Sequence, residues 1–94
     1  MLYAAKCYWP GVSQSELEQV ATRALKDDSH PAHSDVVYRG SLLFIDDDLV
    51  LCLFEGPTRI AVKHASERAG IPCERVMQSV WLGPDPRPQL AVTP

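Results

Sequence analysis

The sequence lacks the features that mark several specialised classes of protein. It contains only three cysteines and no CxxC pair, so neither a disulfide framework nor a common zinc motif is indicated. No apolar stretch approaches the roughly 18 residues of a membrane span. The basic residues are scattered and the net charge is -3, which argues against a nucleic-acid footprint. The N-terminus has neither the basic start nor the long apolar stretch of a signal peptide. We therefore expect a cytoplasmic protein with reduced thiols and no nucleic-acid or membrane partner.

What the sequence does contain is enough apolar material for one core. A chain of 94 residues with 46% hydrophobic residues is typical of a single globular domain. We expect this domain to span residues 1–82. Residues 83–94 are rich in proline and poor in core-forming residues, so we expect a C-terminal tail there.

The most informative segment is the apolar run from Leu49 to Phe54, which is closed by Glu55 and Gly56. A strand with one face in water alternates apolar and polar residues, because successive side chains point to opposite faces. This run has no polar member, so it predicts a strand that is covered on both faces.

Other local signals predict three more strands and two helices. Ser13 and Glu16 form a capping-box pattern at the start of the first helix. Pro57 suits the first turn of the second helix, which should stop at Gly70. Gly40 indicates a bulge within a strand. The expected strands are residues 3–9, 36–45, 49–55 and 75–82, and the middle two are joined by an aspartate turn at 46–48.

The order strand, helix, strand, strand, helix, strand predicts an α+β fold of the ferredoxin-like βαββαβ type. Two helices would cover one face of a four-stranded antiparallel sheet. The other face then needs a cover from outside the chain. A second copy, in a dimeric α/β-barrel type assembly, or a ligand would supply it.

A second set of expectations concerns metal binding. In the ferredoxin-like strand order, we expect the first and third strands to be parallel central neighbours and the fourth strand to lie antiparallel beside the first. The ends of the first and third strands should then meet the start of the fourth strand. Cys7, Cys73 and Glu55 would then be candidate ligands of a divalent transition metal. The neighbourhood would also contain Tyr8, Cys52 and Glu74. The alternative is that the cysteines are small buried hydrophobes.

Aromatic and charged side chains are candidates for the lining of the uncovered sheet face. Ligand pockets are mostly apolar with a few polar groups, and dimer interfaces are enriched in Tyr, Trp and Arg, so these residues fit either role. The candidate lining comprises Tyr3, Tyr8, Trp9, Tyr38, Arg39 and Trp81. The candidate ligand-binding residues are Tyr8, Tyr38, Arg39, Glu55 and His64.

The central block resembles a known family. The segments 51–57, 61–62 and 67–70, which read LCLFEGP, AV and ERAG, are similar to those of a family of small bacterial ferredoxin-like domains that includes a nickel-binding protein. The resemblance covers most of residues 3–82 and implies a face-to-face dimer. Positions where the nickel-binding branch has histidine hold Lys6, Cys7, Tyr8, Ser66 and Met77 here. His64 is shifted by two residues, or about 200° around a helix. We therefore expect nickel binding to be weak or absent.

Two classes of function remain open from the sequence. The first is a homodimeric binding module for a small molecule or a divalent metal. The second is a small cofactor-independent enzyme, an oxygenase or isomerase of the dimeric α/β-barrel type. A cavity that contains Arg39, Glu55 or His64 would favour the enzyme.

Overall fold

The computed structural model describes residues 1–28, 30 and 35–84 of the chain. Its elements follow the expected βαββαβ order, with one short 3-10 turn between the middle strands. They are β1 (Leu2–Tyr8), α1 (Gln14–Asp28), β2 (Val37–Phe44), η2 (Ile45–Asp47), β3 (Leu49–Glu55), α2 (Arg59–Arg68) and β4 (Arg75–Ser79). The ferredoxin-like class is therefore confirmed. Most of the predicted tail lies outside the described residues, and β4 ends at Ser79 rather than at Leu82.

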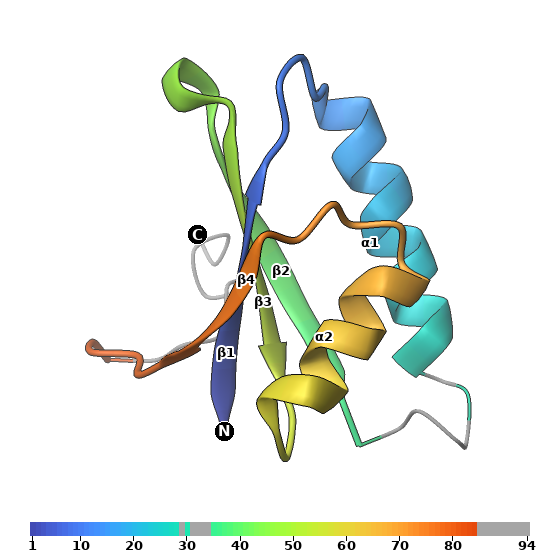
Figure 1. Cartoon of the computed structure of the whole chain (residues 1–94), viewed down its shortest axis with the longest axis vertical. Helices are drawn as coiled ribbons and strands as arrows, with labels where there is room; N and C mark the ends of the chain where they lie inside the picture. Colours follow the sequence, from blue (N-terminus) through green and yellow to red (C-terminus); the bar gives the residue numbers. More distant parts are fainter. Residues whose placement is uncertain (29, 31–34, 85–94) are drawn as a thin grey trace.

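The four strands form one antiparallel sheet in the order β2-β3-β1-β4. Figure 1 shows α1 and α2 together on one side of this sheet, with no helix on the other side. The core lies between the two layers and includes Phe54, Val50, Val20 and Val62. The prediction that the helices cover only one sheet face is thus confirmed for the part of the chain that the structure describes.

Local chemistry explains where the helices begin and end. The Glu16 N–H donates to Ser13 Oγ at 3.1 Å, and the Ser13 N–H donates to Glu16 Oε1 at 3.4 Å, which completes the capping box. The second helix begins at Arg59, and its N-cap is Thr58, whose Oγ1 accepts from the Ala61 N–H. Pro57 therefore precedes the helix instead of lying in its first turn, because Thr58 supplies the cap.

The end of α2 is tied to α1. Gly70 has a φ of 77°, in the left-handed region that glycine adopts without strain. Next to it, Arg23 Nε on α1 donates to the Ala69 carbonyl at 2.8 Å. Arg68 and Asp27 form a second link between the helices, at 2.9 Å. These contacts hold both helices against the same face of the sheet.

Candidate functional site

The sheet presents an uncovered face opposite the helices, which we call the open face. On β1 and β3, the residues Tyr3, Ala5, Cys7, Val50, Cys52 and Phe54 are buried and belong to the core beneath the helices. The alternate residues of each strand must point to the other side. With the register of the ladders, the open face consists of Leu2, Ala4, Lys6, Tyr8, Val37, Gly40, Leu42, Phe44, Leu49, Leu51, Leu53, Glu55, Arg75, Met77 and Ser79.

Most of the open face is apolar. Leu42 and Phe44 on β2 are 53% and 41% exposed, although both are large hydrophobic side chains. The leucines of β3 on this face are only half-buried. Contiguous exposed apolar patches of this kind are typical of interaction surfaces. The run Leu49–Phe54 predicted a strand covered on both faces. Within one subunit only the helix side is covered, where Val50, Cys52 and Phe54 lie in the core.

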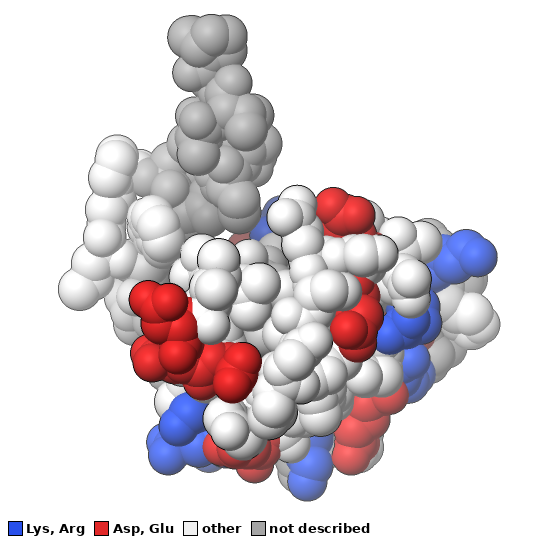
Figure 2. All heavy atoms as spheres, turned by 90° about the horizontal axis from the view of Figure 1, so that it is seen from above, with Lys and Arg blue, Asp and Glu red and all other residues white. Residues whose placement is uncertain are grey.

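The charged groups of the open face other than Glu55 lie at one end of it. Lys6 of β1 stands opposite Arg75 of β4, and we call these two residues the basic pair. The β2–β3 turn lies at the same end, because Tyr8 stands opposite Leu49. This turn carries the exposed residues Asp46 and Asp47. Figure 2 looks down on this end and shows acidic side chains gathered on the left, where Figure 1 places the turn.

The predicted lining of the open face is partly wrong. Tyr38 is only 8% exposed and lies on the helix side, with its ring edge against Phe54 and its hydroxyl 2.5 Å from Ser41 Oγ. The reason is the bulge at Arg39, where the β2–β3 register shifts between Tyr38 and Gly40. The extra residue reverses the alternation, so Tyr38 faces the core. Burial raises the pKa of its hydroxyl.

Two further members of that predicted lining also belong to the helix side. Tyr3 lies in the core, and Trp9 packs against it. Trp81 follows the end of β4 and is 48% exposed. Tyr8 lies on the open face and is 55% exposed.

The polar residues predicted to bind a ligand are dispersed. Arg39 Nε donates to Glu55 Oε1 at 2.9 Å, and both side chains are substantially exposed at the β2 side of the sheet. This hydrogen bond lowers the pKa of the Glu55 carboxyl. His64 is exposed on α2, in the helical layer. Of the five candidates, only Tyr8, Arg39 and Glu55 lie on or beside the open face.

The predicted metal cluster is wrong because β1 and β3 are antiparallel. Glu55 stands opposite Leu2, whereas Cys7 stands opposite Val50 at the other end of the same ladder. Leu2 and Cys7 are five steps apart along β1, a distance of about 17 Å. Glu55 therefore cannot share an ion with Cys7 and Cys73. The prediction that the end of β1 lies beside the start of β4 is correct, since the Glu74 N–H donates to the Lys6 carbonyl at 2.8 Å.

The three thiols lie on the helix side of the sheet. Cys7 and Cys52 are fully buried, and Cys73 is partly exposed. The hydrogen-bonding contact with Cys52 and burial raise the pKa of the Cys7 thiol above its usual value of 9.0. Ser41 Oγ donates to Cys52 Sγ at 3.3 Å. These contacts fit the interpretation of Cys7 and Cys52 as small core residues.

The described residues of a single subunit do not form a nickel site. Residues 1–28, 30 and 35–84 contain no group of three His, Cys, Asp or Glu side chains placed to hold one metal ion. The thiols of Cys7 and Cys52 are enclosed by core residues, and neither carries a carboxylate or imidazole as a hydrogen-bond partner. These residues therefore give no basis for a reaction at a nickel ion within one subunit.

Sequence reasoning missed a cavity between α2 and β4. It is lined by Arg59, Ile60, Lys63, Cys73, Glu74, Arg75 and Val76 and has a volume of about 270 Å³. Three of these residues are cationic. The signal in the sequence was the pair Arg59 and Lys63, two cations one helical turn apart at the start of a helix.

The structural similarity to a solved protein agrees with the fold. The crystal structure of SCO4226 from Streptomyces coelicolor A3(2) superposes with a TM-score of 0.75 at 19% identity, covering 88% of this chain and 100% of the other. No curated protein matches the sequence. No helix in the described part of the chain has the length and apolar character needed to cross a bilayer.

A family model connects the sequence to this fold more directly. The model, described as "Nickel responsive protein SCO4226-like", matches residues 8–78. The matched range runs from the end of β1 into β4 and thus includes both helices and the β2–β3 hairpin. Since this is well over half of the sequence, the chain belongs to the SCO4226-like family of nickel responsive proteins.

Proposed function

We propose that the protein is a homodimeric binding module in which two open faces pack against each other and enclose a small molecule. The observation that carries this proposal is the apolar open face, opposite the face that both helices cover. A second copy is the natural cover because sheets pack face to face at about 10 Å, with side chains of both faces filling the space between them.

The charges at one end of the open face support a second copy as the occupant. The basic pair lies on the β1–β4 side, while Asp46 and Asp47 lie on the β2–β3 side of the same end. A two-fold axis parallel to the strands would place the β2 edge of one copy over the β4 edge of the other. The acidic turn of each copy would then face the basic pair of its partner, which gives complementary charges at both edges of the interface.

The open face supports binding more than catalysis. An enzyme of the dimeric α/β-barrel type would need polar groups inside the enclosed space. Arg39 and Glu55 form an ion pair with each other at the β2 side of the sheet, and His64 lies on α2, in the helical layer. The leucines of β3 and Met77 of β4 would instead contact an apolar body. A small molecule with apolar surface therefore suits this face better than a metal ion does.

The test compares two leucines with nearly equal exposure. Leu42 lies on the open face and is 53% exposed, while Leu25 on α1 is 57% exposed. Leu42→Glu should dissociate the dimer, because it buries a carboxylate without a partner. Leu25→Glu is the control and should leave the dimer intact. Light scattering at micromolar concentration gives the mass, and native mass spectrometry of untagged protein reports any retained molecule. A monomeric parent protein would refute the proposal.

The orientation of the two copies can be tested by exchanging charges. Lys6→Glu alone and Asp47→Lys alone should each weaken the dimer, because each change places like charges opposite one another. The double variant should recover much of the lost affinity. If the double variant is weaker than either single variant, the acidic turn and Lys6 do not face each other, and the two-fold arrangement described above is wrong.

A further inference from the structure

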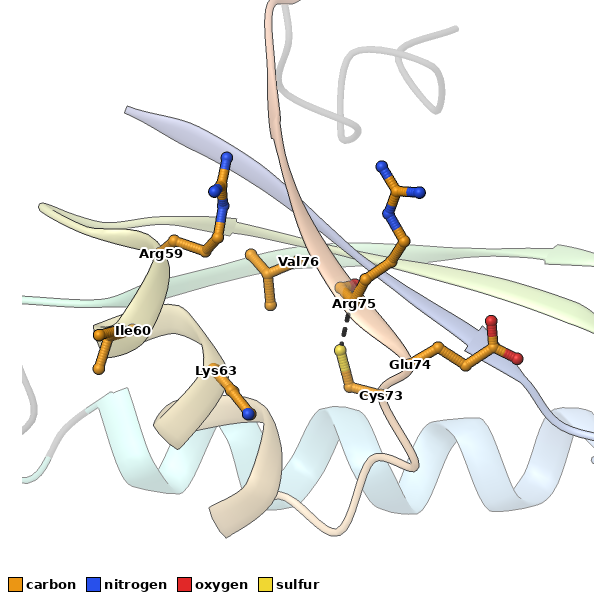
Figure 3. Close-up of a pocket in the computed structure, with 7 residues that line it drawn as sticks. All are labelled: Arg59, Ile60, Lys63, Cys73, Glu74, Arg75 and Val76. Atoms are coloured by element: carbon orange, nitrogen blue, oxygen red, sulfur yellow. Dashed lines mark hydrogen bonds between the residues drawn. The ribbon is translucent and has the colours of Figure 1, made fainter.

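The cavity between α2 and β4 is ringed by positive charge. Arg59 and Lys63 come from α2, and Arg75 comes from β4. The only acidic residue of the lining is Glu74, so the lining carries a net charge of +2. Ile60 and Val76 give the cavity an apolar part. Figure 3 shows the Arg59 and Arg75 guanidinium groups raised on the same side of the view, and the Lys63 ammonium below Cys73.

None of the three cations has an acidic partner in the described part of the chain. Arg39 pairs with Glu55 and Arg68 with Asp27, whereas the side chains of Arg59, Lys63 and Arg75 make no hydrogen bond within the described residues. This contrasts with Arg23, Arg39 and Arg68, which are each held by an acceptor. The cationic heads around the cavity are therefore available to a ligand.

The position of these cations is unfavourable for the helix itself. Arg59 is the first residue of α2, where the helix dipole disfavours positive charge, and the first turn contains no acidic residue. Lys63 follows four residues later on the same face, so the two like charges repel. An anion bound between them would remove both conflicts.

We propose that this cavity binds a small phosphate monoester. The dianionic phosphate would lie between the guanidinium groups of Arg59 and Arg75, with the Lys63 ammonium on the opposite side of the cavity. Its two negative charges balance the net charge of the lining. The apolar part of the ligand would contact Ile60 and Val76. A volume of about 270 Å³ restricts this ligand to a phosphate with a small organic group. Arg75 also belongs to the basic pair of the open face, whereas Arg59 and Lys63 lie on α2, so the tests of this site use Arg59 and Lys63.

The first experiment is a calorimetric titration at constant ionic strength with inorganic phosphate, phenyl phosphate and succinate. We expect saturable binding of both phosphates, with phenyl phosphate tighter because its ring contacts Ile60 and Val76. Arg59→Gln and Lys63→Gln should each weaken binding about tenfold, since each removes a charge-assisted hydrogen bond. Glu74→Gln should have the opposite effect and tighten binding, because it removes the one negative charge of the lining.

Arg39→Gln is the matched control, since it removes the same charge at the β2 side of the sheet. It should change phosphate affinity by less than about twofold. Equal weakening by Arg39→Gln and Arg59→Gln would mean nonspecific attraction, and the proposal would be wrong. It would also be wrong if neither phosphate gives saturable heat, or if succinate binds as tightly as phenyl phosphate.

The second experiment uses Cys73 as a reporter of occupancy. Cys73 lines the cavity, and its Sγ donates to the Arg75 carbonyl at 3.2 Å. Saturating phenyl phosphate should slow alkylation of Cys73 by iodoacetamide, while sodium chloride of the same ionic strength should not. Unchanged alkylation in the presence of phenyl phosphate would contradict binding in this cavity. The dimer test is unaffected by either result, because Arg59 and Lys63 lie in the helical layer, away from the open face.

Discussion

The reactivity of the three thiols provides a quantitative test of the fold. The side chains of Cys7 and Cys52 are fully buried between the sheet and the helices, whereas Cys73 lies at the entry of β4 and is partly exposed. A thiol reagent can reach a buried cysteine only when the protein opens. We therefore predict one fast thiol, Cys73, and two slow ones in the native protein.

The expected difference in rate follows from the free energy of opening. Cys7 and Cys52 are on the two central strands, which should open only on global unfolding. With a free energy of unfolding of about 5 kcal/mol, the open state is populated about once in several thousand molecules. Both thiols should then react at least about 10³-fold more slowly than in urea. The raised pKa of Cys7 adds to its protection, because the thiolate is the reactive form.

The assay is alkylation with iodoacetamide followed by peptide mapping, in native buffer and in urea. Cys73→Ser is the control variant and should abolish the fast phase while leaving the slow phase unchanged. Native alkylation of all three cysteines within a factor of about ten would refute the reasoning, since it would mean that β1 and β3 open without global unfolding.

Three further predictions concern backbone conformation, pH and nickel. Gly70→Ala and Gly11→Ala should each lower the free energy of unfolding, measured with urea, by about 1–2 kcal/mol, because both glycines have a positive φ. Gly70→Ala should cost more of the two, because its new methyl group would lie 3.1 Å from Arg23 Nη2, whereas that of Gly11→Ala meets no atom within 4 Å. Burial raises the pKa of the Asp28 carboxyl, although the hydrogen bond from the Tyr38 N–H opposes this shift. The contribution of Asp28 to stability therefore falls as pH rises above about 3.8. Asp28→Asn keeps an acceptor for that N–H and should flatten this pH dependence in urea titrations at several pH values; an unchanged slope would contradict it. Calorimetry should show weak or no nickel binding, and stoichiometric submicromolar binding would overturn this expectation.

Much of the fold could be predicted from local signals in the sequence. The strand Leu49–Glu55 agrees with the predicted bounds because an unbroken apolar run closed by Gly56 leaves little choice. The capping box at Ser13 and the helix stop at Gly70 were also correct, since each depends only on neighbouring residues. The start of α2 was misplaced because Pro57 and Thr58 are both suited to a helix start, and only the hydrogen bond of Thr58 decides between them.

The direction of the central strands was wrong for a reason that connectivity could have corrected. A helix crossover from β1 makes β2 run parallel to β1, and the hairpin then reverses β3. The ladder between β1 and β3 must therefore be antiparallel, as observed. The prediction that Glu55 lies beside Cys7 ignored this reversal of β3. In the antiparallel ladder the two residues lie at opposite ends, so the predicted metal ligands are far apart.

The face of Tyr38 could not be predicted from alternation alone. Counting back from Leu42 in steps of two places Gly40 and Tyr38 on the open face. The bulge recognised at Gly40 breaks this count, because Arg39 is an extra residue that moves Tyr38 to the core. A bulge thus has to be placed to the residue before any side chain beyond it can be assigned to a face.

The two proposed sites differ in how far sequence reasoning could reach them. The open face depends on one strand pattern, the unbroken apolar run from Leu49 to Phe54 in β3. Such a run requires a cover on both faces of the strand whatever the rest of the chain does. The cavity depends on the approach of α2 to β4, which brings Arg59 and Lys63 beside Cys73 and Arg75. Unpaired cations at a helix start are the only local sign of such a site, and they are common on ordinary surfaces. Their placement on two elements that line one partly apolar cavity supports a ligand, and that placement is a property of the packed fold alone.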